Sequence, residues 1–163
     1  MARKTLIDRL RQHHGIEHAT MTLLSRKTPG IQLAARSDFE GFTVFGVVDT
    51  ATLRTAAGEA LARLQAGQVE LAVHPNCGTN LVTAGTLAGV AAFMAGSGRQ
   101  RSAWDRLPSA ILGATLAMIV AVPLGRWMQE HVTTSPDVAG LRIVDVVRLN
   151  GGPVARHRVR IDH

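Results

Sequence analysis

The chain has 163 residues, which is enough for one domain, or for one small domain joined to a membrane element. Tyr is absent and aromatic residues make up 4%, yet mean hydropathy is positive, a combination that favours contact with lipid over a soluble core of large side chains. The formal net charge is +6, but the arginines are scattered and not interleaved with aromatics. We therefore expect anionic lipid headgroups, and no nucleic acid, as the partner.

The N-terminal part is expected to be one helix over residues 2–25, with an apolar stripe on one side and basic residues on the other. Its first residues are charged and include no apolar stretch of the kind found in a cleavable signal peptide, so this part is expected in the cytoplasm. The single cysteine, Cys77, excludes an intrachain disulfide.

The first helix contains the segment His13-His14-Gly15-Ile16-Glu17-His18. His14 and His18 are four residues apart, so in a helix both imidazoles project from one face. Two such imidazoles can bind zinc, and the intervening Glu17 could take a proton from a metal-bound water. The order His-x-x-Glu-His is the inverted zincin signature.

A second interpretation makes the same segment an amphipathic surface helix whose histidines lie on the edge of its apolar face. Gly15 lowers the helix propensity of the segment. Our hypothesis for Gly15 is that it lets a neighbouring backbone come close to the metal.

After this helix, residues 31–34 and 42–48 are expected to form a small antiparallel pair of strands, joined by a polar turn over residues 37–41. A helix should follow from about residue 51 to Gln65, with Asp49 and Thr50 at its start and Gly67 at its end.

Glu59 of this second helix has two interpretations. It lies four residues before Arg63, which predicts a solvated ion pair; alternatively it faces the histidine helix as a metal ligand.

Residues 69–73 alternate between apolar and polar types and are expected to form a short strand. They lead into His74-Pro75-Asn76-Cys77-Gly78-Thr79, a tight polar turn just before the most apolar part of the chain. His74 and Cys77, three residues apart, could both reach one metal. Equally, this turn could be a plain entry loop whose Asn and Thr side chains cap the next helix.

Two long stretches lack charged residues, at 78–98 and at 107–125. About 20 helical residues cross a hydrocarbon core, so each stretch can span a membrane, and we expect a transmembrane hairpin over about 79–98 and 107–125. Small residues at four-residue spacing, Gly85 with Gly89 and Gly113 with Ala117 and Ala121, would let the two helices approach closely. The alternative is a buried hairpin in a soluble bundle. Arg99, Arg101, Trp104 and Arg106 would lie near one membrane interface and Trp127 near the other.

The C-terminal part is expected to be a β-hairpin, with strands over 141–147 and 154–161 around a turn at 150–153. Arg156, Arg158 and Arg160 would share one face, against lipid headgroups, with His157 on the opposite, more apolar face. His131 and His163 look incidental.

Together, His14-Gly15-Ile16-Glu17-His18 and His74-Pro75-Asn76-Cys77-Gly78-Thr79 resemble a group of bacterial membrane proteins of unknown function, described only as predicted metal-dependent enzymes. There, an HG-x-EH segment and an HP-x-CGT segment recur, the second just ahead of a membrane helix. The overall layout, including residues 59–67 and 141–143, is similar to that of a small two-helix family of membrane proteins of unknown function. This resemblance covers most of the chain and implies a metal site but no substrate.

A more local resemblance, to inverzincin peptidases of the pitrilysin type, is confined to His14, Glu17 and His18. Those enzymes take a third ligand, a glutamate, from a later helix, a position for which Glu59 or Glu70 could stand in. Their large two-lobed fold does not fit in this chain, so peptidase activity does not carry over with the motif.

These patterns predict an α+β membrane protein with three parts. Residues 1–77 would be a small αβ part, 78–126 the transmembrane hairpin, and 127–163 a loop and β-hairpin that pack on the first part. The soluble part would face the cytoplasm at the inner (plasma) membrane.

The leading functional hypothesis is a membrane-bound zinc-dependent hydrolase, such as a peptidase, with Glu17 as general base. His14 and His18 would bind the metal, with His74 as third ligand ahead of Glu59 and Cys77 completing or gating the sphere. The alternatives are a metal that only stabilises the fold, and an accessory subunit that joins a homo-oligomer or a larger membrane complex.

Overall fold

A computed structural model describes residues 5–97, 102–152 and 154–163. The chain divides into two compact units: an αβ unit of residues 1–74 and 130–163, and a hairpin unit of residues 75–129. The predicted contacts of Arg99 and Arg101, and the ends of the predicted elements at residues 2–4, 98 and 153, lie outside the described residues.

The first helix, α1, spans Leu6–Lys27. Thr5 caps its N-terminus in a capping box with Asp8, which satisfies backbone N–H groups that have no partner inside the helix. Arg26 and Lys27 occupy the last turn, where positive charge interacts favourably with the helix dipole. The predicted helix is therefore confirmed, and it continues through Gly15 without a break.

The second helix, α2, spans Thr50–Gln65, and the Asp49 carboxylate accepts a hydrogen bond from the Thr52 N–H as predicted for its N-cap. The predicted strand at 69–73 is wrong, because residues Val69–Ala72 form a short 3₁₀ helix, η1. Its backbone uses bonds between residues three apart, from Leu71 to Gln68 and from Val73 to Glu70. Alternation over so few residues does not distinguish a strand from such a turn.

Four strands form one antiparallel sheet in the order β1-β2-β4-β3. They span Ala34–Asp38 (β1), Gly41–Phe45 (β2), Arg142–Leu149 (β3) and Arg156–Asp162 (β4). The C-terminal hairpin is confirmed, and it pairs with the first strand pair through β2 and β4. The predicted first strand, 31–34, is wrong in position, because the chain turns within two residues after Asp38 and the polar residues before that turn belong to β1.

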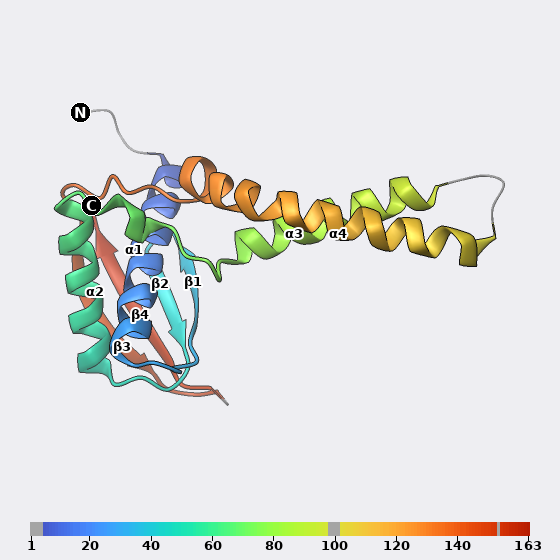
Figure 1. Cartoon of the computed structure of the whole chain (residues 1–163). Coiled ribbons are helices and arrows are strands. Elements are labelled where there is room, and N and C mark those ends of the chain that lie inside the picture. Colours follow the sequence, from blue (N-terminus) through green and yellow to red (C-terminus); the bar gives the residue numbers. More distant parts are fainter. Residues whose placement is uncertain (1–4, 98–101, 153) are drawn as a thin grey trace. The chain divides into compact units, whose positions relative to one another are not determined.

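One hydrophobic core lies between the helices and one face of the sheet (Figure 1). Helix α1 packs against α2, β1 and β2, and α2 packs against β3. The core is filled by medium-sized and small side chains, in keeping with the scarcity of aromatics: from α1 Ile16, Ala19 and Leu24, from α2 Leu53, Ala57 and Leu64, and from the sheet Phe42, Val44, Val146 and Val159. His157 also faces this side and is 1% exposed, as its predicted place on the apolar face requires.

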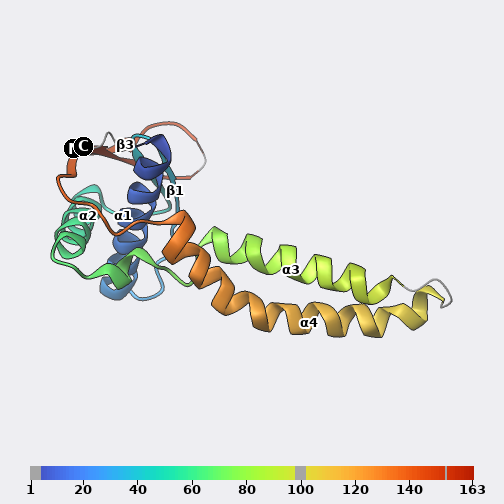
Figure 2. The ribbon, with the colours of Figure 1, turned by 90° about the horizontal axis from the view of Figure 1, so that it is seen from above.

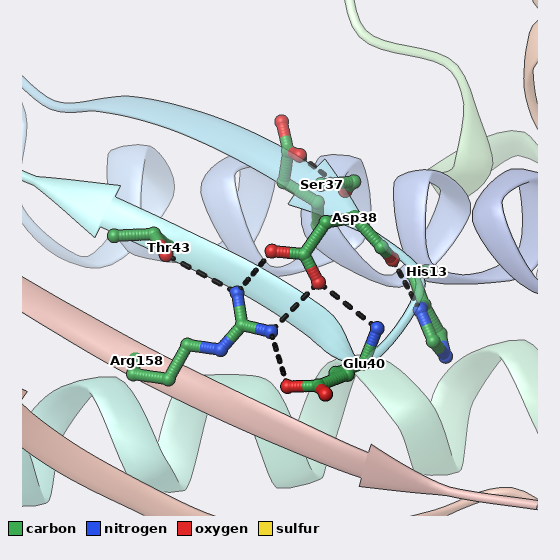
Figure 3. Close-up of polar contacts among 7 residues, drawn as sticks. His13, Ser37, Asp38, Glu40, Thr43 and Arg158 are labelled. Carbon is green, nitrogen blue, oxygen red and sulfur yellow. Dashed lines mark hydrogen bonds and ion pairs between the residues drawn. The ribbon is translucent and has the colours of Figure 1, made fainter.

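The opposite face of the sheet carries an ion pair that corrects the predicted role of Arg158. Its guanidinium donates to both carboxylate oxygens of Asp38, at 2.5 and 2.7 Å, and to the Thr43 hydroxyl, with Glu40 3.6 Å away (Figure 3). This bond to Arg158 lowers the pKa of the Asp38 carboxyl. Arg158 is 12% exposed and already paired, so it is not available to lipid headgroups.

The hairpin unit contains helix α3, Gly78–Gly96, and helix α4, Ala103–Met128, which pack side by side (Figures 1 and 2). A π-helical turn, η2, continues α4 over Gln129–Thr133, where the sequence predicts a loop from 132. Both helices are long and apolar enough to cross a membrane, as the sequence predicts. Almost none of the residues in their most apolar stretches are buried, unlike those of the core helix of a soluble bundle.

The small residues of the hairpin do not all serve the contact between its helices. A Cβ at Gly113 would lie 3.0 Å from the Ala91 carbonyl oxygen and from the Ala95 Cβ, so Gly113 allows the close approach that its spacing predicts. A Cβ at Gly85 or Gly89 would meet nothing within 4 Å among the described residues. The four-residue spacing identifies helix faces lined by small residues, but only the packing shows which of these faces contacts the other helix.

The ion pair of Arg158 should stabilise the αβ unit. We expect Arg158→Gln to lower the free energy of unfolding by about 1 to 2 kcal/mol, because it removes charge-assisted bonds at a largely buried position. Arg142→Gln is the matched control, since Arg142 pairs with Asp162 at a site where both side chains are more than half exposed. Equal effects of the two substitutions on denaturant unfolding in detergent would contradict a special role for the Arg158 pair.

Candidate metal centre

Helix α1 places His14 and His18 one turn apart, as predicted. Their ring centroids are 4.3 Å apart, and one ring nitrogen of each lies within 4.8 Å of the other. His18 is buried and His14 half-buried. Two zinc–nitrogen bonds of about 2.0–2.1 Å can bridge such a pair after small side-chain rotations.

Backbone carbonyls fix the protonation of both rings. Nδ1 of His14 lies 2.9 Å from the Thr133 carbonyl oxygen, and Nδ1 of His18 lies 2.8 Å from that of Ala72. A carbonyl oxygen only accepts, so Nδ1–H is the donor in each bond, and in the neutral form of each ring the lone pair lies on Nε2. Histidines that bind metals commonly have this arrangement, with the second ring nitrogen donating to a carbonyl or a carboxylate.

His74 joins the two helical histidines from a distant part of the sequence. It follows η1 directly, and its ring centroid lies 5.9 Å from that of His18. The Ala72 carbonyl that orients His18 is two residues before His74, so one short segment both orients a histidine and supplies another. The αβ unit therefore gathers three imidazoles, and their roles as ligands remain a prediction.

Cys77 belongs to the hairpin unit, three residues after His74. Its side chain forms no disulfide and is buried, 8% exposed, and its sulfur accepts from the Thr79 N–H at 3.4 Å at the start of α3. The N-cap of α3 is therefore Cys77, not an Asn or Thr as the entry-loop alternative predicted.

Glu17 is a buried carboxylate on the same helix, 7% exposed, and it accepts a hydrogen bond from the Ser37 hydroxyl at 2.5 Å. Ser37 lies on β1, so the carboxylate is directed toward the edge of the sheet (Figure 3 shows Ser37 beside Asp38). A buried carboxylate one residue before His18 can carry negative charge beside a bound cation or accept a proton there.

Glu59 does not fit the predicted role of a metal ligand. Its two carboxylate oxygens bind Lys27, in the last turn of α1, and Arg63. These bonds, that of Lys27 foremost, lower the pKa of Glu59. Lys27 lies more than two helical turns after His18 in α1, and Glu59 of α2 is bound to Lys27. The solvated ion pair is therefore the correct interpretation of Glu59.

Gly15 allows the chain after η2 to pass close to α1. A Cβ at Gly15 would lie 2.6 Å from the Ser135 carbonyl oxygen, and the Ser135 N–H donates to the Arg11 carbonyl at 2.9 Å. Arg11 in turn donates to the carbonyls of His131, at 2.9 Å, and Thr134, at 3.2 Å. Gly15 thus admits a neighbouring backbone, as our hypothesis requires, and the closeness of that backbone to a metal stays a prediction.

His163 is not incidental, contrary to the sequence interpretation. Its Nε2 lies 3.0 Å from Nε2 of the fully buried His13, whose Nδ1 is 2.7 Å from the Asp38 carbonyl oxygen. Burial lowers the pKa of His13. The histidines of α1 therefore face different parts of the fold, and His13 binds the sheet. No local sequence pattern predicts that His163 is the partner of His13.

Sequence comparisons place these residues in a family without an assigned function. Residues 9–146 match the model of a family described as a domain of unknown function, DUF6391. An uncharacterised protein of Picosynechococcus sp. is 36% identical over 140 residues, which cover 77% of this chain and 66% of that protein. No solved structure matches the chain significantly. Membership in a family of unknown function is confirmed, whereas neither description names a two-helix membrane protein, a metal-dependent enzyme or a peptidase.

Gly15 provides a test of the close backbone contact. We expect Gly15→Ala to destabilise the αβ unit by about 1 to 3 kcal/mol, because the new methyl group would meet the Ser135 carbonyl. Gly58→Ala is the control, since Gly58 lies in the middle of α2 with open space around it, and there alanine should stabilise by about 0.5 to 1 kcal/mol. Opposite signs of the two shifts in thermal unfolding confirm the contact; a stabilising Gly15→Ala would contradict it.

Proposed function

Because the chain belongs to the DUF6391 family, whose description assigns no activity, we propose its function from the metal centre: it is a membrane-anchored protein that binds one divalent metal ion, zinc foremost. The observation that carries this proposal is the pair of Nδ1–H bonds to backbone carbonyls, which orient His14 and His18 as metal ligands. Helix geometry alone brings two histidines together, but does not set both tautomers.

The donor set suits zinc. His14 and His18 supply two imidazoles, His74 is a third candidate in the same unit, and Cys77 stays the predicted thiol donor. Cys77 follows His74 by three residues, within about 10 Å of extended chain, so one segment can bring both donors to one ion. A Cys77 thiolate and the buried Glu17 carboxylate would together offset the two positive charges of the ion.

The membrane anchor is the hairpin of α3 and α4. Their apolar side chains are largely uncovered along both helices, which is costly in water and favourable in lipid. The hairpin would span the plasma membrane with the αβ unit on its cytoplasmic side. Lipid is the expected partner, together with a second copy or another membrane protein.

Metal content tests the ligand set. Wild-type protein purified in detergent should retain about one zinc per chain, whereas His14→Ala and His18→Ala should fall below about one-tenth of an equivalent. His157→Gln is the control and should retain the metal, because His157 contacts Thr50 rather than the three histidines. Full zinc in His74→Ala would remove His74 from the ligand set, and a wild type without metal would favour the accessory-subunit alternative.

A second candidate function is hydrolysis, favoured by the buried carboxylate of Glu17, the residue that precedes His18 in α1. With three protein ligands, zinc keeps a position for water, and Glu17 would accept the proton of that water as the bond to substrate forms. With four protein ligands, the centre has no water position and serves stability alone.

The model ester p-nitrophenyl acetate distinguishes these two centres. In the hydrolase, Glu17→Gln should keep its zinc and lose hydrolysis by at least about a hundredfold. Unchanged hydrolysis in Glu17→Gln would exclude Glu17 as the base. No zinc-dependent hydrolysis by the wild type would support the structural centre.

A further inference from the structure

The two histidines of the candidate centre are each bound to a chain segment that adjoins one helix of the hairpin. His18 donates to Ala72 in η1, shortly before α3 begins at Gly78. His14 donates to Thr133, the last residue of the π-helical turn that continues α4. Both carbonyls lie in the αβ unit, and the backbone runs from each of them directly into a membrane helix.

A second side chain of α1, Arg11, also binds the turn that contains Thr133. One terminal nitrogen of its guanidinium donates to the carbonyls of His131 and Thr134, on either side of the carbonyl that accepts from His14. Arg11 also accepts the Ser135 N–H at its own carbonyl. Arg11 and His14 lie three residues apart on the same face of α1, and together they bind three carbonyls of one turn, those of His131, Thr133 and Thr134.

We propose that the metal centre is coupled to the two ends of the hairpin, and that Arg11 is a positioning residue for this coupling. The inference rests on the proposed metal site and adds its regulation. A cation on Nε2 withdraws electron density from the ring, so each Nδ1–H becomes a stronger donor to its carbonyl. Metal binding then orders the segments 69–74 and 130–135.

Coupling of this kind is reciprocal. If the metal strengthens the bonds to Ala72 and Thr133, then any movement of the hairpin that withdraws these carbonyls weakens metal binding by the same free energy. The bistable element is the π-helical turn, since turns of this kind are rare and concentrate at functional sites. A change in the membrane helices is thereby transmitted to metal affinity.

Hydrogen exchange of the full chain in detergent micelles, with and without Zn²⁺, is the first test. Zinc should slow exchange of the amides in 69–74 and 130–135 by about tenfold or more, and leave those of β3 and β4 unchanged. Uniform slowing across the αβ unit, or no slowing in these two segments while zinc is bound, would overturn the coupling.

Substitution of Arg11 is the second test. Arg11→Met should weaken zinc affinity by about ten- to a hundredfold and change the visible absorption of the Co²⁺-substituted protein, with partial rescue in Arg11→Lys. Arg54→Met is the matched control, because Arg54 also donates to a backbone carbonyl, that of Val146, but away from the histidines. Equal zinc affinities in Arg11→Met and wild type would overturn the role of Arg11.

The outcomes separate this inference from the function on which it rests. Absence of zinc binding in the wild type overturns the metal centre itself. Zinc binding with neither local protection nor an Arg11 effect leaves the centre standing and overturns only the coupling. If Arg11→Met does not fold, the exchange measurement on the wild type still decides.

Discussion

The arrangement of the αβ unit depends on hydrogen bonds between side chains of α1 and backbone carbonyls of distant segments. Arg11 and His14 hold the turn after α4, His18 holds η1, and His13 holds the end of β1. Buried carbonyls require partners, and here imidazoles and a guanidinium provide them. The same bonds set the tautomers of His14 and His18, so the packing of the unit and the chemistry of the candidate centre have one physical origin.

This arrangement explains why a glycine lies in the middle of α1. Helix propensity disfavours glycine at such a position by about 1 kcal/mol. At Gly15, however, the Ser135 carbonyl lies where a side chain would be, so the backbone of the segment after α4 can run directly along the helix. The cost in propensity is offset by contacts that no larger residue would permit.

The hairpin unit follows a different rule. Its helices contact each other through small residues such as Gly113 and leave large apolar side chains at the surface, which is the reverse of the αβ unit with its closed core. In the proposed membrane location, lipid in place of water would remove the reason to bury those side chains. The αβ unit therefore buries its apolar side chains, whereas the hairpin unit leaves them exposed. The chain passes between the two units shortly after Ala72 and shortly before Thr133.

The sequence by itself determined the elements whose causes are local: the capped helices, the C-terminal β-hairpin, the two apolar spans and the pairing of His14 with His18. It misplaced β1 and read η1 as a strand, because short polar or alternating runs satisfy several backbone conformations. Only the tertiary structure decided that Glu59 and Arg158 are engaged in ion pairs and that His163 meets His13. It also showed that backbone carbonyls orient the candidate ligands. Carbonyl groups are the same in every residue and leave no sequence signal, so long-range contacts to them emerge only when the chain is folded.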